Sequence, residues 1–279
     1  MGAHEIDPLP PASGTLERWA WDYVVSTDAA TKLDPVAPDL GAEACFEVDA
    51  AERRLSAPGR PPAWQVVSRH ARTPSAASLG NPKNRAKLVL TFAHHEVQAA
   101  ELMAWAILAF PTTPREFRAG LARLVVDEAR HARAYVAHAR TLGMELGDHP
   151  VRDWFWERVG SVRAPAQFVA LLGLGFEAAN LDHSARYAAL FRAAGDEAGA
   201  RLQEAIGAEE RLHVRFAARW FEHFAGALDF ETWLAHLPRP LTPMVLRGKP
   251  YERGARLASG LPADFVDALE RWQPAGAGA

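Results

Sequence analysis

The chain of 279 residues has a single cysteine, Cys45, so it cannot form an internal disulfide bond, and the lack of further thiolates argues against a structural zinc site. It also lacks a charge imbalance, because 34 acidic and 31 basic residues leave a net charge of −3, which argues against broad, charge-driven binding of nucleic acid. Long hydrophobic runs are missing, since a run such as Phe168 to Phe176 is far shorter than the roughly 20 residues that cross a membrane. The first residues show neither the basic nor the apolar region of an export signal. We therefore expect a cytoplasmic protein with no membrane partner.

Hydrophobic residues nevertheless make up 49% of the chain, which is enough to bury a core. Prolines interrupt the first 83 residues so often that long regular elements are not expected there. One helix is expected around Leu16–Thr27, where apolar side chains recur on one face. We interpret residues 1–83 as an arm that packs on the rest of the protein.

Four long helices are predicted between residues 84 and 226, because proline and glycine punctuate four amphipathic stretches. They span approximately Asn84–Phe110, Thr113–Gly143, Pro165–Gly195 and Glu197–Ala225. The second is expected to begin with a capping box, in which Thr113 is the N-cap, Pro114 the first helical residue and Glu116 the closing acid. Short connections within each pair of helices predict two antiparallel hairpins.

About twenty residues, 144–164, separate the two predicted hairpins and are enough to cross the length of a bundle. Two hairpins joined by one long crossover is the ferritin-like variant of the four-helix bundle. The sequence therefore predicts an all-α protein with a ferritin-like bundle over residues 84–226. Residues 227–279 are expected to form a C-terminal extension, with short helices near Glu231–His236 and Ala263–Trp272.

Each predicted hairpin carries one glutamate and one Glu-x-x-His pair within an expected apolar stripe. The six residues are Glu96, Glu128 and His131 in the first hairpin and Glu177, Glu210 and His213 in the second. Glu96 precedes Glu128 by 32 residues, and Glu177 precedes Glu210 by 33. All lie near the middle of their helices, so antiparallel packing is expected to bring them to one level.

Ionised carboxylates are costly to bury without a partner, so these glutamates predict a bound cation. One Glu from each of two helices and a Glu-x-x-His from each of the other two is the di-iron or di-manganese carboxylate arrangement. Carboxylates with imidazoles suit iron or manganese, and we expect two iron ions, with manganese or a mixed pair as open alternatives. Glu128 and Glu210 would then bridge both ions, while Glu96 with His131 and Glu177 with His213 would each complete one.

The segment Asp-Glu-Ala-Arg-His at residues 127–131 resembles the Asp-Glu-x-Arg-His motif of ferritin-like di-iron oxygenases. Further segments are similar to a bacterial ferritin-like family that is sometimes placed near the tRNA hydroxylases: His94-His95-Glu96, Phe110-Pro111, Phe176 to Asp182 and His213 to Phe216. The resemblance implies a di-iron centre and oxygen chemistry, without a settled substrate. The fourth helix departs from the motif, because Leu212 stands where the motif has arginine.

Residues beside the predicted ligands are expected to support them. Asp127 and Glu209 each precede a Glu-x-x-His pair, where either could accept a hydrogen bond from a ligand histidine. His95 is expected to be a core or supporting residue rather than a ligand. Glu101 and Asp182 follow Glu96 and Glu177 by five residues, which turns a helix by about 140°, so they are expected to pair elsewhere, for instance with arginines.

Three further residues are candidates for the wall of a pocket beside the metal ions. Gly173 lies one turn before Glu177 and would leave room for a substrate, with close packing of two helices as the alternative. Tyr135 and Trp220 lie past the ligand histidines on the same helix faces, where ordinary core packing is the alternative.

The predicted function is that of an enzyme, a di-iron oxygenase or oxidase. It would use dioxygen and electrons from an external donor to hydroxylate, desaturate or N-oxidise a small organic substrate. A rubrerythrin-like or ferritin-like protein that handles peroxide or iron is one alternative, although Cys45 alone cannot build a rubredoxin-type iron site. A metal-free binding or scaffold bundle is the other, and a homodimer stays open. The basic stretch Leu237 to Arg256 is expected to be a solvated tail packed on the bundle, with binding of an anion or RNA as its alternative.

Overall fold

A computed structural model describes residues 9–41, 45–68 and 73–274. Regular structure within these ranges is helical, apart from one isolated parallel bridge between Val66 and Val151, so the predicted all-α class is confirmed. No helix in these ranges is both long and apolar enough to cross a membrane. The chain divides into two compact units, Met1–Pro74 with Pro82–Ser161 and Ser75–Asn81 with Val162–Ala279.

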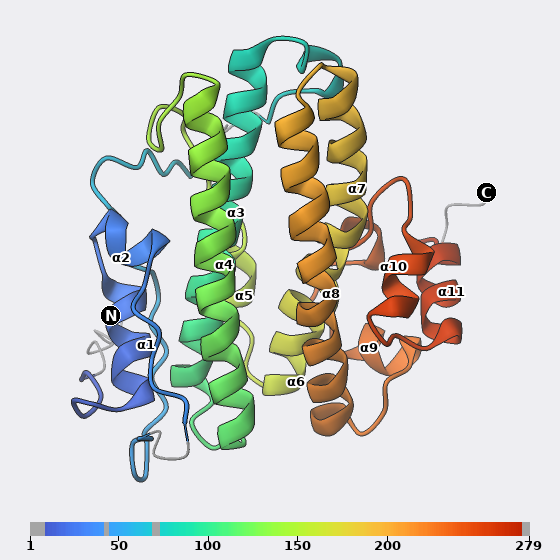
Figure 1. The fold of residues 1–279 in the computed structure, drawn as a ribbon. Helices are drawn as coiled ribbons and strands as arrows, with labels where there is room; N and C mark the ends of the chain where they lie inside the picture. The colour runs from blue at the N-terminus through green and yellow to red at the C-terminus, as the bar shows by residue number, and fades with distance from the viewer. Residues whose placement is uncertain (1–8, 42–44, 69–72, 275–279) are drawn as a thin grey trace, which may run out of the picture. The chain divides into compact units, whose positions relative to one another are not determined.

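The first unit is built on a long antiparallel hairpin of α3 (Pro82–Ala109) and α4 (Arg115–Thr141) (Figure 1). The N-terminal helices α1 (Leu16–Val25) and α2 (Ala29–Leu33) pack on this hairpin, and so does α5 (Trp156–Val159). Pairing between α1 and α3 buries the apolar face that the sequence predicted for the first helix. The arm is therefore part of the core of this unit.

The predicted capping box of α4 is wrong. The N-cap is Pro114, and no side chain caps the helix. The Thr113 hydroxyl instead donates to the carbonyl of Phe110 at 2.7 Å, which closes the turn after α3. A threonine hydroxyl can hydrogen-bond to a nearby backbone carbonyl instead of capping a helix. Here it donates to a carbonyl in the turn that precedes α4.

The second unit contains a continuous helix of three parts, α6 (Pro165–Phe168), η2 (Val169–Glu177) and α7 (Ala178–Ala193). The middle part, η2, is a π-helix, so the prediction of one α-helix from residue 165 to 195 is wrong over nine residues. The partner helix α8 (Glu197–Ala225) has the predicted bounds. Asp196 caps its first turn by accepting from the amide of Gly199 at 2.8 Å, and Gly226 ends it with a left-handed φ of 84°.

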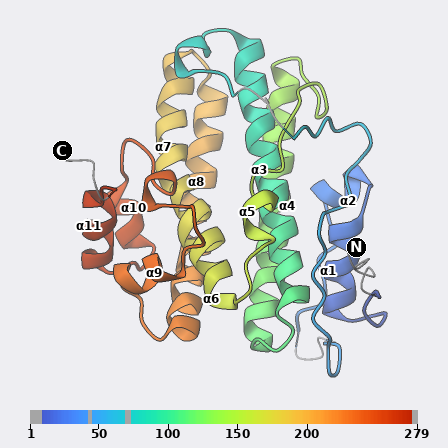
Figure 2. The same cartoon turned by 180° about the vertical axis from the view of Figure 1, so that it is seen from behind.

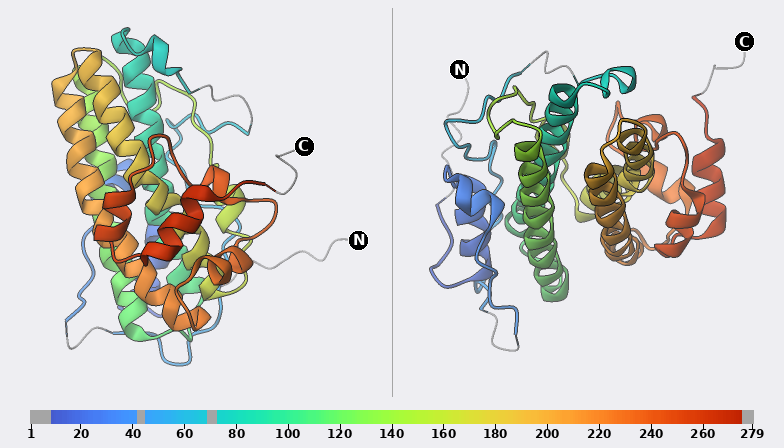
Figure 3. Two further views of the ribbon diagram at one scale, coloured as in Figure 1. Left: turned by 90° about the vertical axis from the view of Figure 1, so that its right-hand side faces the viewer. Right: turned by 45° about the horizontal axis from the view of Figure 1, so that its top comes forward.

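The C-terminal extension folds against this second hairpin. Its helices α9 (Phe230–His236), α10 (Arg253–Ala258) and α11 (Ala263–Arg271) lie together beside η2, α7 and α8 (Figures 2 and 3). Short 3₁₀ turns, η1 (Ala76–Ser78) and η3 (Pro243–Val245), also belong to this unit. The short helices expected near residues 231–236 and 263–272 are confirmed.

A buried ion pair anchors the basic stretch of the extension to α7. Asp182 accepts from Arg256 Nη2 at 2.6 Å and from the backbone amides of Gly248 and Glu252 at 2.7 Å each. Both charged side chains are fully buried, and the Arg256 guanidinium lies over the ring of Tyr251. The predicted arginine partner of Asp182 is confirmed, and Arg256 is a structural residue of the fold.

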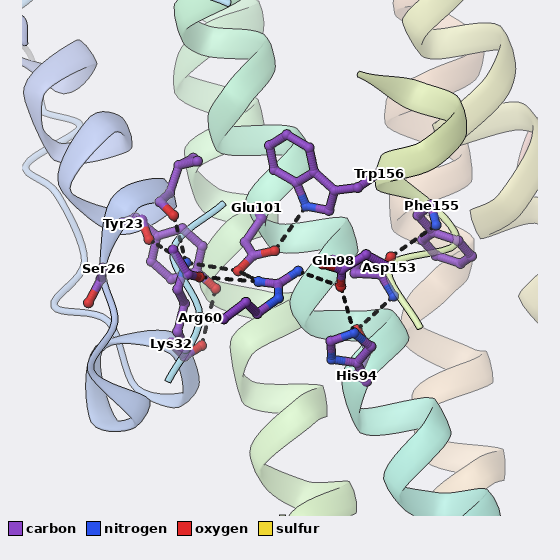
Figure 4. A network of polar contacts seen from close by, with 12 residues as sticks. Tyr23, Ser26, Lys32, Arg60, His94, Gln98, Glu101, Asp153, Phe155 and Trp156 are labelled. Carbon is purple, nitrogen blue, oxygen red and sulfur yellow. Dashed lines mark hydrogen bonds and ion pairs between the residues drawn. The ribbon is translucent and has the colours of Figure 1, made fainter. Parts of the chain in front are cut away.

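A second buried network joins the arm to α3 (Figure 4). Glu101 forms ion pairs with Lys32 of α2, at 2.8 Å, and with Arg60. Its other carboxylate oxygen accepts from the indole nitrogen of Trp156 at 3.0 Å. Lys32 is fully buried and also donates to the backbone carbonyl of Tyr23. Glu101 thus has the arginine partner that was predicted, together with a lysine.

The same network reaches α5 through Asp153, which pairs with both Arg60 and His94 Nε2 at 2.8 Å. Burial raises the pKa of Asp153, but the hydrogen bond from His94 and the charge of Arg60 outweigh it and hold the pKa at about 2. Burial also lowers the pKa of His94, which favours its neutral form. The negative charges of Glu101 and Asp153 are therefore balanced by the positive charges of Lys32 and Arg60. These ion pairs hold α3 in place within the first unit.

Close packing of the second hairpin rests on Gly173 in η2. A Cβ atom at this position would lie 2.4 Å from the Cβ of Ala217 on α8, so the two helices approach over a bare backbone. Glu177 and His213 lie one turn along their antiparallel helices from this contact. The packing alternative for Gly173 thus has direct support, and its place in a pocket wall stays a prediction.

Substitution of Gly173 by alanine should lower the free energy of unfolding by about 1–3 kcal/mol, because the new methyl group overpacks the contact with Ala217. The matched control is Gly254→Ala in α10, where nothing lies within 4 Å of the added Cβ. That change should be neutral or stabilise by up to about 1 kcal/mol. Urea denaturation of the metal-free proteins measures both. Equal effects of the two substitutions would contradict close packing at Gly173.

Substitution of Asp153 by asparagine should reveal the depressed pKa of this carboxyl as a pH-dependent loss of stability. Since the folded pKa is about 2 and the ordinary value 3.8, the charged form adds about 2 kcal/mol above pH 5 and loses this advantage as the pH falls toward 2. Denaturation of metal-free wild type and variant at pH 7 and pH 3 should show the gap about halved at pH 3. Asp22→Asn, which breaks an exposed pair with Arg18, should change stability little at either pH. A gap that grows on acidification would refute the assignment.

Candidate metal centre

The first unit brings together the three residues that the sequence assigns to it. Glu96 comes from α3, and Glu128 and His131 come from successive turns of α4. Each offers one ligand atom, and these atoms lie within 4.8 Å of one another. All three side chains are at most 3% exposed, and His131 Nδ1 lies 3.4 Å from the Glu128 carboxylate. We call these three residues the first triad.

The second unit repeats this arrangement with Glu177, Glu210 and His213, which we call the second triad. Glu177 is the last residue of η2, and the other two residues lie one turn apart on α8. Their ligand atoms also lie within 4.8 Å of one another, and the side chains are again at most 3% exposed. His213 Nδ1 lies 3.2 Å from the Glu210 carboxylate.

Asn180 lies beside the second triad, and the sequence patterns did not identify it. Its side-chain amide donates to Glu210 Oε1 at 3.4 Å. Asn180 lies three residues after Glu177, and residues spaced by three share one face of a helix. This spacing from Glu177 is the sequence feature that could have identified Asn180. The amide helps to orient one carboxylate of the triad.

The local sequence explains why the carboxylates are buried. On α4, apolar residues at three- and four-residue steps precede and follow Glu128 and His131, and the same holds for Glu210 and His213 on α8. These neighbours are Leu121, Leu124, Val125, Ala132 and Tyr135 on α4, and Ile206, Val214, Ala217 and Trp220 on α8, all of them buried. Packing of these stripes carries the glutamates into the core.

The donor set of each triad fits a divalent cation. Two carboxylates and one imidazole supply two negative charges and hard oxygen and nitrogen ligands, which iron and manganese accept. Three protein ligands do not fill an octahedral coordination sphere, so positions are left for another ligand. A buried pair of carboxylates without a cation would carry a large desolvation cost. The chemistry and burial of the triads therefore support a metal site within each unit.

The predicted supporting residues take different places around the ligands. Asp127 is partly exposed and lies 3.3 Å from Arg130, and Glu209 is half-buried. The His95 ring stacks on Phe155 with a centroid distance of 4.9 Å. Their predicted roles beside the metal ligands stay predictions.

Tyr135 and Trp220, the aromatic pocket candidates, both pack in hydrophobic surroundings. The ring of Tyr135 contacts Phe92 with a centroid distance of 5.6 Å, and Trp220 stacks on Phe224 at the same distance. Both side chains are buried. These contacts agree with the core-packing alternative, and a further role of either residue in a pocket stays a prediction.

Comparison with known proteins adds a family to this geometry. No curated protein and no solved structure matches the chain. The model of the family described as "Protein of unknown function (DUF455)" matches residues 24–267, a span that includes both triads and most of the C-terminal extension. Because this match covers most of the sequence, the chain belongs to that family.

Proposed function

We propose that the two triads form one dinuclear carboxylate centre within a ferritin-like bundle made of the two hairpins. The observation that carries this proposal is the repeat itself. Two units of the same chain each gather a glutamate and a Glu-x-x-His pair, all buried, with ligand atoms within 4.8 Å. One such cluster could be a local polar feature, but two clusters with matched spacing in one chain favour a common role in binding metal.

Charge balance supports two ions rather than one. Four buried carboxylates carry four negative charges, which two divalent cations neutralise. Glu128 and Glu210 are proposed to bridge the ions, because each stands beside its histidine on the helix that supplies two ligands. Glu96 and Glu177 then complete one ion each. The hydrogen bond from Asn180 would hold the Glu210 carboxylate in a bridging orientation.

Two bound irons would supply redox chemistry with dioxygen, and on this basis we propose an oxidoreductase that oxidises a small organic substrate. The residues of the chain hold the ions, exclude bulk water through the apolar stripes around each triad, and leave coordination positions open. Electrons would come from an external donor. Manganese or a mixed pair is compatible with the same ligands.

Metal stoichiometry tests the dinuclear centre. Wild-type protein should bind about two ions per chain, and Glu96→Gln and Glu177→Gln should each bind about one, because each variant loses a ligand to one ion only. The control is Glu116→Gln, an exposed glutamate in the first turn of α4, which should still bind two. Elemental analysis after anaerobic loading with Fe²⁺ measures all four. Two ions in every variant would refute the ligand assignment, and none in wild type would favour the scaffold alternative.

Oxygen consumption tests the proposed chemistry. Wild-type protein loaded anaerobically with two Fe²⁺ per chain should consume dioxygen when exposed to it, and Glu128→Gln should lose most of this reaction with the loss of a bridging carboxylate. Oxygen uptake is measured with an oxygen electrode, and the iron content of the protein is determined after oxidation. Iron that accumulates well beyond two per chain would favour storage. Faster reaction with peroxide than with dioxygen would favour a rubrerythrin-like role.

A further inference from the structure

The helix that delivers Glu177 is a π-helix up to that residue. The segment η2 covers Val169–Glu177, and the amide of Ala178 donates to the carbonyl of Gly173, five residues earlier. π-Helices are rare and short, and they occur frequently at functional sites. By contrast, α3 is α-helical throughout and delivers Glu96 without such a segment. The contacts of η2 with its neighbours are therefore candidates for what favours the π register before Glu177.

One candidate is the C-terminal extension, which supplies a hydrogen bond to the backbone of this segment. Trp233 on α9 donates from its indole nitrogen to the carbonyl of Ala170 at 2.9 Å. The donor is fully buried, and its ring packs against Phe230 and Phe265 with centroid distances of 5.7 and 5.4 Å. A rigid aromatic cluster therefore fixes the position of this N–H group.

A second contact from the extension lies near the same carbonyl. A Cβ atom placed on Gly175 would lie 3.2 Å from a methyl group of Leu246 and 3.3 Å from the carbonyl oxygen of Ala170. Leu246 is fully buried, so it cannot move aside into solvent. Trp233 and Leu246 thus hold the π segment from the side that faces the extension.

The register of η2 decides where Glu177 lies. A change from the five-residue to the four-residue hydrogen-bond pattern shifts the backbone and rotates the residues that follow. Gly173 would then leave its contact with Ala217, and the carboxylate of Glu177 would leave the second triad. The indole bond to Ala170 opposes such a change because it fixes a carbonyl at the start of the segment.

We propose that Trp233 is a positioning residue for the second metal ion. Its indole N–H holds the π register of η2, which keeps the Glu177 carboxylate beside Glu210 and His213. The inference rests on the proposed dinuclear centre for its metal, and it gives the C-terminal extension a role in that centre. It concerns the second triad alone, so the first triad should not depend on Trp233.

The test compares Trp233→Phe with Trp105→Phe. Both changes keep an aromatic ring and remove a buried indole N–H that donates to a backbone carbonyl, that of Ala170 for Trp233 and that of Leu55 for Trp105. Each tryptophan change is made in two backgrounds. The Glu96→Gln protein should retain the ion of the second triad, and the Glu177→Gln protein should retain the ion of the first. Competition titration with Mn²⁺ measures the affinity of the ion that remains.

Trp233→Phe should weaken Mn²⁺ binding about 10- to 100-fold in the Glu96→Gln protein, as losses of supporting hydrogen bonds at metal sites do. It should have little effect in the Glu177→Gln protein, and Trp105→Phe should have little effect in either. Equal weakening in both backgrounds, or by both tryptophan changes, would show a general loss of stability and overturn the proposal. Unchanged affinity would overturn it as well.

Hydrogen exchange of the metal-free, otherwise wild-type protein separates this inference from the proposed function. Amides of residues 170–178 should exchange at least tenfold faster in Trp233→Phe than in Trp105→Phe, whether or not the protein binds metal. Leu246→Val, which shortens the side chain beside Gly175, is a second variant that should accelerate exchange in the same segment. Absence of both Fe²⁺ and Mn²⁺ binding in wild type would refute the dinuclear centre. Unchanged exchange would refute the hold of Trp233 on the π-helix.

Discussion

Burial of carboxylates is the constraint on which both units depend. Each unit places two glutamates and one histidine in a helix core, at most 3% exposed, among side chains that are otherwise apolar. Well-packed hydrophobic residues would serve folding as well or better than buried charges. A bound cation would account for the burial of these glutamates. The charge of the triads, rather than the helical architecture, is what points to a metal centre.

Precise ligand geometry requires rigid helices, and the two units achieve this differently. In the first, charge holds α3, because Glu101 pairs with Lys32 and Arg60 on a face turned away from Glu96. In the second, the ion pair of Asp182 with Arg256 anchors the extension, and Trp233 of the extension donates to the backbone of η2. Segments outside the two hairpins thus support both triads. The family match likewise extends beyond the helices that carry the ligands.

Sequence patterns predicted the elements that depend on local chemistry. The bounds of α8 follow from Asp196 and Gly226, and each triad follows from Glu-x-x-His pairs within apolar stripes. The partners of Glu101 and Asp182 were predicted by type, because five residues turn a helix away from the ligand face. The identity of Arg60 and Arg256 could not be predicted, since those contacts join residues 41 and 74 positions apart. The ferritin-like arrangement of the two hairpins stays a prediction.

The π-helix shows most clearly what periodicity cannot reveal. An apolar segment such as Val169 to Phe176 is buried on nearly every side, so it carries no amphipathic pattern from which a change of register could be read. Its register depends on a distant indole and on the contact of Gly173 with Ala217. The two halves of the chain therefore repeat their ligands but not their backbones. If the triads form one centre, its two ions are inequivalent, because Glu177 ends a π-helix whereas Glu96 lies on an α-helix.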